Sequence, residues 1–291
     1  MRHISVLLNE TIDGLNIKDG DLIIDGTLGD GGHTEEILKR FPNVRVIAFD
    51  RDPEAIKRAK VNLSKFLNRV KIINSNFSEL DNHLEKGEVP DGIIFDFGLS
   101  TYQLLESGRG FSFKGEEPLL MTMGDDSLDT AFNVVNTFPE KELERIIREY
   151  GEEKYSWRIA KRIVETRKVD TIKTSGELAR IIADAVPKMF GRKIDPATKT
   201  FQGIRIFIND ELRSIENGLK AGLSVLKEGG RICAISFHSL EDRIVKNVFR
   251  DEAKDGSFKI ITKRPIVSDE KELQENPRAR SAKLRIIEKN D

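Results

Sequence analysis

Four short apolar runs rich in β-branched residues recur through the first hundred residues, and they constrain the fold more than any other feature. They cover residues 21–25, 44–49, 70–73 and 92–96. Short apolar runs of this kind are typical of strands buried inside a parallel sheet. Asp52-Pro53, between the second and third runs, suits the N-cap and first position of a crossover helix. The chain is therefore expected to begin as a doubly wound α/β domain.

The same alternation returns near residue 204. Apolar residues at helical spacing form one long stripe that ends at Gly229-Gly230; they are Ile208, Leu212, Ile215, Leu219, Leu223 and Leu226. A strand over 231–236, a helix over roughly 240–250, and strands over 258–262 and 282–288 are expected to follow. The complete sheet would have about seven strands.

Residues 106–203 interrupt this alternation and show helical spacing without a convincing strand. A capping-box pattern at Thr174 to Glu177 marks the start of one helix. Inserted after the fourth strand, an all-helical domain would cover the sheet edge where ligands of open α/β folds bind. We therefore expect a discontinuous cofactor-binding domain, 1–105 and 204–291, and a helical substrate-binding insert, 106–203.

Composition limits the classes of partner. The net charge of −1 argues against a uniformly basic surface, so any polyanion site must be local. Cys233 is the single cysteine and the four histidines lack metal-ligand spacing, so neither a disulfide framework nor a metal site is expected. No secretory leader or run of about 18 apolar residues is present, which predicts a cytoplasmic protein without a membrane span.

The sharpest local signal is DGTLGDGGHT at residues 25–34, directly after the first predicted strand. Glycines there let the backbone turn sharply and approach a ligand, and the following helix offers free N–H groups. The spacing is not G-x-G-x-x-G, and Asp25 and Asp30 would repel a pyrophosphate. A cationic cofactor fits better, although a glycine turn without a ligand is the alternative.

Three further residues lie where predicted strands end. Asp50 is placed to accept hydrogen bonds from ribose hydroxyls, or else to cap the next helix. Asp96 would face cofactor or substrate across the same crevice, or cap the next segment. His238 follows the fifth predicted strand, and a lone histidine there is more often packed or capping than catalytic. Neither a nucleophile elbow nor a Walker motif is present, which weakens hydrolase and NTPase hypotheses.

Basic residues concentrate in the insert and near the end of the chain. Each group could be a solvated face. Next to a cofactor crevice, the same placement suits a nucleic-acid substrate. The substrate-binding candidates are Arg158, Arg162, Lys193, Arg278 and Arg280.

Several segments, spread over nearly the whole chain, resemble the RsmH (MraW) family of ribosomal RNA methyltransferases. They are HISVLLNE, IDGTLGDGGHT, AFDRDPEAI, FDFGLS, RGFSF, YGEE, FQGIRIFINDEL, ISFHSLEDRIVK and NPRARSAKLR. The resemblance implies a methyltransferase sheet interrupted by a helical domain, and methyl transfer from S-adenosylmethionine to the N4 amino group of a cytosine. The cytosine would lie in the decoding region of 16S ribosomal RNA in the small subunit. The implied cofactor contacts are Gly31, Gly32, His33, Asp50, Phe77, Asp96 and Gln103.

Two segments depart from the family pattern: Ser-Thr-Tyr-Gln at 100–103 replaces Ser-Ser-Pro-Gln, and Leu-Met-Thr-Met-Gly at 120–124 replaces an acidic methionine motif. Both lie at the junction of core and insert, where they affect loop conformation and substrate fit rather than the cofactor assignment.

The implied mechanism is direct in-line transfer without a covalent intermediate. Asp96 is the candidate acceptor for the amino hydrogens and would stabilise positive charge as it develops. Phe237 would stack on an unstacked target base, and His238 would help to orient it.

Three alternatives remain at this stage. A nicotinamide-dependent oxidoreductase would also use Asp50 and a glycine loop, but the glycine spacing opposes it. A DNA amino-methyltransferase is disfavoured because the Asp/Asn/Ser-Pro-Pro-Tyr signature is absent. A non-enzymatic RNA-binding or assembly factor could retain the pocket as a relic. The sequence carries no signal for an oligomeric state.

Overall fold

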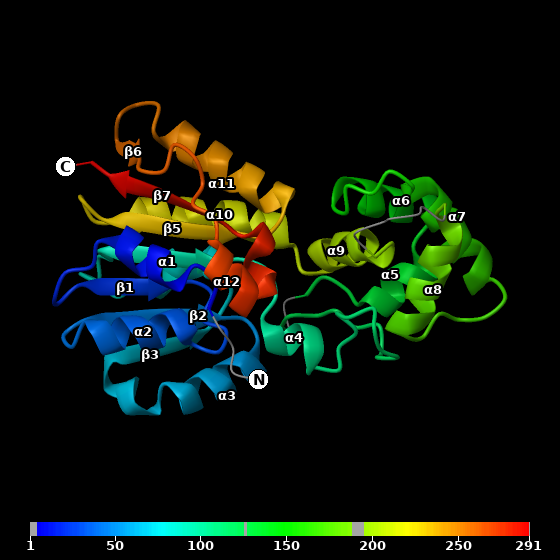
Figure 1. Cartoon of the computed structure of the whole chain (residues 1–291), viewed down its shortest axis with the longest axis horizontal. Coiled ribbons are helices and arrows are strands. Elements are labelled where there is room, and N and C mark those ends of the chain that lie inside the picture. The colour runs from blue at the N-terminus through cyan, green and yellow to red at the C-terminus, as the bar shows by residue number, and fades with distance from the viewer. Residues whose placement is uncertain (1–4, 125–126, 188–194, 291) are drawn as a thin grey trace. The chain divides into compact units, whose positions relative to one another are not determined.

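The computed structural model describes residues 5–124, 127–187 and 195–290. The chain divides into two compact units (Figure 1). The first, called here the sheet unit, comprises Met1–Gly98 and Leu212–Asp291, and the second, the helical unit, comprises Leu99–Glu211. The helical unit thus begins before residue 106 and ends after residue 203, the limits expected for the insert.

A seven-stranded sheet runs through the sheet unit in the order β3-β2-β1-β4-β5-β7-β6. The first five strands are parallel, and β7 runs antiparallel between β5 and β6. This arrangement confirms the Rossmann-like methyltransferase fold. The strands are β1 Leu22–Asp25, β2 Arg45–Asp50, β3 Val70–Asn74, β4 Gly92–Asp96, β5 Arg231–Ser236, β6 Phe258–Ile260 and β7 Lys283–Lys289.

Both faces of this sheet are buried, because successive side chains of a strand point to opposite faces. In β1, Ile23 packs into one apolar cluster with residues of α1 and α2, while Ile24 packs into another with residues of α10 and α11. The helical elements of the sheet unit are α1 Leu8–Leu15, α2 Gly32–Arg40, α3 Pro53–Asn62, η1 Ser64–Arg69, η2 Phe77–His83, α10 Glu211–Val225 from its second residue onward, α11 Ser239–Glu252, α12 Glu270–Glu275 and η3 Pro277–Ser281.

The helical unit has its own apolar core. The structure describes no strand in residues 99–124, 127–187 and 195–211, apart from an isolated bridge between Pro118 and Thr174. The predicted capping box is confirmed, since the side chain of Thr174 accepts a hydrogen bond from the N–H of Glu177. The helices are α4 Thr101–Leu105, α5 Ala131–Thr137, α6 Glu140–Glu149, α7 Ser156–Arg167, α8 Ser175–Ala185 and α9 Ala197–Ile208.

The predicted apolar stripe spans two helices: its residues from Leu212 to Leu223 lie in α10, whereas Ile208 belongs to α9. α9 ends at Ile208 and α10 begins at Glu211. Between them Asp210 has a φ of 47°, in the left-handed region that breaks a right-handed helix. The apolar spacing continues in phase across the break, so periodicity alone could not reveal it.

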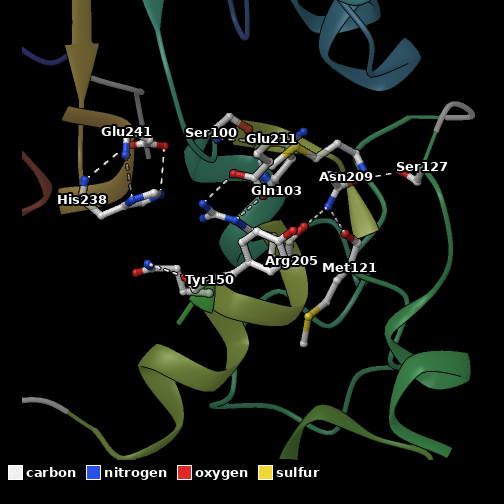
Figure 2. A network of polar contacts seen from close by, with 12 residues as sticks. Ser100, Gln103, Met121, Ser127, Tyr150, Arg205, Asn209, Glu211, His238 and Glu241 are labelled. Atoms are coloured by element: carbon white, nitrogen blue, oxygen red, sulfur yellow. Dashed lines mark hydrogen bonds and ion pairs between the residues drawn. The ribbon is translucent and has the colours of Figure 1, made fainter. Parts of the chain in front are cut away.

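Asn209, at this break, binds the segment that departs from the family pattern. Its side-chain NH2 donates to the carbonyl oxygen of Met121 at 2.8 Å (Figure 2). Its Oδ1 accepts from the N–H of Met123 at 2.8 Å. The same oxygen accepts from the hydroxyl of Ser127 at 2.9 Å. Met121 is fully buried with a φ of 55°. A single buried amide therefore fixes the conformation of this loop.

Replacing Asn209 with Ala is expected to lower the free energy of unfolding by about 1–3 kcal/mol, because buried backbone groups of Met121 and Met123 lose their partner. Denaturant unfolding would measure the loss. Asn217→Ala, an exposed change on α10, serves as the control and should shift stability by no more than about 0.5 kcal/mol. Equal midpoints for both variants would contradict the role given to Asn209.

No helix within the described ranges combines the length and apolar character needed to cross a membrane.

Candidate functional site

The predicted glycine loop connects β1 to α2 at the carboxyl end of the strand. Gly29 and Gly31 have φ angles of 53° and 86°, a region that favours glycine. Gly31 is the N-cap of α2. A methyl group on Gly32 would lie 2.0 Å from the Ser5 hydroxyl oxygen. The loop therefore requires glycine for its conformation and its packing.

Asp25, at the end of β1, is fixed inside this loop. One carboxylate oxygen accepts from the Thr34 hydroxyl at 2.7 Å and the other from the N–H of Thr27 at 3.1 Å. The hydroxyl oxygen of Thr27 in turn accepts from the N–H of Asp96 at 2.6 Å. Burial raises the pKa of Asp25. These bonds join the loop to the end of β4, so that Asp25 acts as a support for the site.

Asp96, the last residue of β4, has an oxygen available for a ligand. Its Oδ1 is buried and forms no hydrogen bond with the described part of the chain. Its Oδ2 lies 3.9 Å from Nδ1 of His33, whose Nε2 is 3.2 Å from the carbonyl oxygen of Val6. Burial raises the pKa of Asp96 well above its usual range, and the charges of Asp25 and Glu241 raise it further. A hydrogen-bond donor or a cation at Oδ1 would offset the free-energy cost of burying this unpaired carboxylate.

Asp50 ends the neighbouring strand β2 and reaches back to the same loop. Its Oδ2 accepts from the N–H of Gly29 at 2.8 Å, and its Oδ1 accepts from the N–H of Asp52 at 2.8 Å. Burial raises its pKa to about 7, although both backbone donors act in the opposite direction. The helix-capping alternative belongs to Asp52, whose side chain accepts from the N–H of Glu54. Asp50 therefore connects the glycine loop to the segment that precedes α3.

Phe77 begins η2, and its ring lies 5.5 Å from that of Phe95 and 5.7 Å from that of Phe97, centroid to centroid. It packs against α10 where Gly218 has no side chain. A methyl group on Gly218 would lie 2.4 Å from Cδ2 of the ring. The position of Phe77 therefore depends on a glycine far away in the sequence.

Replacing Gly218 with Ala is expected to cost about 1–3 kcal/mol of stability, because the Phe77 ring must move within a packed cluster. Gly222→Ala in the same helix is the matched control. Its added methyl group would lie 3.2–3.5 Å from three side-chain atoms, which is a milder overlap than that at Gly218. The higher helix propensity of Ala offsets this overlap. Thermal unfolding of both variants measures the difference, and equal loss in both would refute the specific overlap with Phe77.

His238 is the N-cap of α11, which is the capping role considered from the sequence. Its Nδ1 accepts from the N–H of Glu241 at 3.4 Å, and its Nε2 lies 3.1 Å from Glu241 Oε1 (Figure 2). Glu241 Oε2 accepts from the N–H groups of Phe237 and His238 at 2.7 and 3.2 Å. Both imidazole nitrogens therefore face Glu241, and the half-buried Phe237 is held by the same carboxylate.

Glu241 was missed by the sequence analysis. It is completely buried and organises the segment that follows β5. A glutamate three residues after an N-cap is a capping-box signal, but histidine is not one of the usual N-cap residues, which hid the pattern.

The other predicted residues lie elsewhere. Gln103 belongs to the helical unit, where it is buried and forms a capping box with Ser100: each backbone N–H donates to the other side chain, at 3.1 Å in both directions (Figure 2). The first departure from the family pattern thus forms an ordinary helix start. Lys193 lies outside the described residues.

The remaining basic candidates lie in both units. Arg158 and Arg162 are on the exposed face of α7. Arg278 and Arg280 are in η3 of the sheet unit, Arg280 exposed and Arg278 half-buried, with its pKa lowered by burial. Among the predicted site residues of the sheet unit, direct contacts join the glycine loop to Asp50 and Asp96, while Phe77 and Phe237 pack in separate clusters.

The glycine loop, the strand-end carboxylates and an antiparallel β7 between β5 and β6 define a methyltransferase of the Rossmann-like class. The chain belongs to the MraW methylase family, whose model matches residues 1–290.

Relatives that share the name "Ribosomal RNA small subunit methyltransferase H" match almost the whole chain. The protein of Leptospira interrogans is 49% identical over 279 residues, which is 94% of this chain and 83% of the relative. That of Clostridioides difficile is 46% identical over 307 residues, 99% of this chain and 98% of the relative. That of Persephonella marina is 44% identical over 292 residues and covers 99% of both chains.

Proposed function

We propose that the protein transfers a methyl group from S-adenosylmethionine to the N4 amino group of a cytosine in the decoding region of 16S ribosomal RNA. The observation that carries this proposal is the buried, unpartnered Oδ1 of Asp96 next to the glycine loop. The names of the relatives support a substrate in small-subunit ribosomal RNA, and such a substrate implies action in the cytoplasm.

The charges of the site suit S-adenosylmethionine. Asp25, Asp50 and Asp96 end three adjacent parallel strands, so their carboxylates gather at one sheet edge. Burial raises the pKa of all three carboxyl groups; a bound sulfonium cation would favour their ionised forms, whereas the pyrophosphate of a dinucleotide would oppose ionisation. This argues against the nicotinamide-dependent alternative. Asp50 would accept hydrogen bonds from the ribose hydroxyls, and Phe77 would contact the adenine. The rest of the cofactor site would be lined by Gly31, Gly32 and His33.

The bound cofactor supplies an electrophilic methyl group, and residues of the chain provide position and charge. Asp96 Oδ1 accepts a hydrogen of the cytosine amino group and stabilises the positive charge that develops on nitrogen. The ionised carboxylate of Asp96 would also be placed to accept the proton that N4 loses. No metal enters this scheme.

The segment after β5 would position the base. Asp96 and Ile235 are register partners in β4 and β5, so Phe237 follows the strand beside Asp96. Its half-buried ring is available for stacking on an unstacked cytosine. His238, whose Nδ1 accepts from the N–H of Glu241, would fix this segment. In this scheme the sheet unit binds the cofactor and the target base, and the helical unit binds other parts of the RNA.

The decisive test is the transfer of labelled methyl from S-adenosylmethionine to small ribosomal subunits that lack the native modification, followed by nucleoside analysis. Label in N4-methylcytidine supports the proposal. Binding of S-adenosylmethionine without turnover on subunits, free RNA or DNA would favour a non-catalytic assembly factor, and label in DNA alone would favour the DNA enzyme.

A further inference from the structure

Helix α7 of the helical unit has one face in the core and one in solvent. Ser156, Ile159, Ala160 and Ile163 are buried. On the opposite side the indole of Trp157 is 56% exposed. A single exposed aromatic residue needs no explanation. Its neighbours on this helix are what distinguish it.

The exposed side chains around Trp157 are strongly basic. Between residues 154 and 168 five exposed side chains are cationic and one, Glu165, is acidic; the cations are Lys154, Arg158, Lys161, Arg162 and Lys168. Among the described residues, the one ion pair that these cations form joins Lys161 Nζ to Glu165 Oε1 at 3.9 Å. In contrast, the arginines of neighbouring α6 are neutralised by glutamates of the same helix. The positive charge of α7 is therefore largely uncompensated.

Cations and aromatic rings alternate on this face. Lys161 Nζ lies 5.3 Å from the centre of the Trp157 ring. Lys154 Nζ and the Arg158 guanidinium carbon lie 4.8 and 5.9 Å from the centre of the Tyr155 ring. Single-stranded nucleic acids are bound by this combination, with bases stacked on aromatic rings and phosphates held by nearby cations. A duplex hides its base faces and would use only the charges.

We propose that the α7 face, defined by Lys154, Tyr155, Trp157, Arg158, Lys161 and Arg162, binds a single-stranded segment of the RNA substrate. A base stacks on Trp157, while Arg158, Lys161 and Arg162 contact the phosphates that flank it. This inference rests on the proposed function and adds to it an RNA-docking surface contained within the helical unit.

Trp157 is the single tryptophan of the chain, so intrinsic fluorescence reports directly on this face. We would titrate the full-length protein with an oligocytidylate of about 12 nucleotides, a length that one binding module covers. Saturable quenching that weakens with salt is the expected result. An RNA duplex of equal length should not quench the fluorescence. Binding without quenching, or equal quenching by the duplex, would overturn the stacking proposal.

Variants separate stacking from charge. Trp157→Ala should weaken oligocytidylate binding about tenfold, measured by anisotropy of labelled RNA, whereas Trp157→Phe should retain most of the affinity. Lys161→Glu should reduce both affinity and salt dependence, whereas Lys141→Glu, an equal charge change at an exposed position of α6, should not. Circular dichroism confirms folding. Unchanged binding by both Trp157→Ala and Lys161→Glu would overturn the assignment.

Methyl transfer to small subunits distinguishes this inference from the proposed function. Trp157→Ala should raise KM about tenfold and leave kcat close to wild type, because the indole would act in docking. If the wild-type protein transfers methyl groups and the Trp157→Ala variant has the same KM, the docking surface is overturned and the proposed function is left intact. Quenching by oligocytidylate without any methyl transfer would support the surface and reject the proposed function.

Discussion

Replacement of Asp96 by Asn is expected to reduce the single-turnover rate of methyl transfer by a factor on the order of 10²–10³, the usual cost of removing one electrostatic contact to a transition state. The amide keeps the shape of the side chain but loses the charge that would stabilise the developing cation. Oδ1 is buried and unpartnered, so little solvent is present to replace it. Rapid-quench measurement with saturating cofactor and RNA would give the rate.

Two further measurements make this result specific. Asp81→Asn, the same change at an exposed position of η2, should leave the rate unchanged. Equilibrium binding of S-adenosylmethionine to the Asp96 variant shows whether the carboxylate mainly holds the cofactor. A normal rate in the variant would remove Asp96 from the mechanism.

Replacement of Asp50 by Asn is expected to weaken S-adenosylmethionine binding about 10- to 100-fold at alkaline pH, the value of a hydrogen bond to a charged group. It should also flatten the pH dependence. The pKa of Asp50 is raised to about 7 by burial, and in the proposed complex the ribose hydroxyls would donate to the ionised form. Wild-type affinity should therefore rise as pH increases through about 7, and fall by up to about tenfold per unit below it. Calorimetric titration over about pH 6–8 measures both effects.

S-adenosylmethionine itself carries groups that titrate. The decisive comparison is therefore between the pH profiles of cofactor binding in the wild type and in the variants. Asp13→Asn, at a side chain that is 75% exposed, should keep the wild-type pH profile. A profile for Asp50→Asn that is parallel to that of the wild type would show that another group governs binding.

The sequence was most informative where structure depends on local pattern. Buried parallel strands read as apolar runs, so β4 and β5 were predicted with their observed limits. Because the carboxyl ends of parallel strands meet at one edge, Asp50 and Asp96 could be assigned to one site from their positions alone. The hydrogen bonds from Gly29 to Asp50 and from Asp96 to Thr27 agree with that placement.

Features that depend on distant partners could not be predicted. The break before α10 is fixed by bonds between Asn209 and a segment more than eighty residues earlier. A glutamate in the first turn of a helix is usually exposed to solvent, so nothing in the sequence indicates that Glu241 is buried. Its burial depends on the pairing of β4 with β5, which are far apart in the sequence. The space that Phe77 occupies depends in the same way on Gly218.

The position of β7 between β5 and β6 has a consequence for synthesis. The helical unit is continuous in the chain and can fold while later residues are still being translated. The sheet unit must wait until residue 289 has left the ribosome, because β7 closes the edge of β5. At roughly 5–20 residues per second, the segment from 212 onward takes about 4–16 s to make. During that interval the nascent chain carries an open, apolar strand edge, the condition in which chaperone binding protects against aggregation.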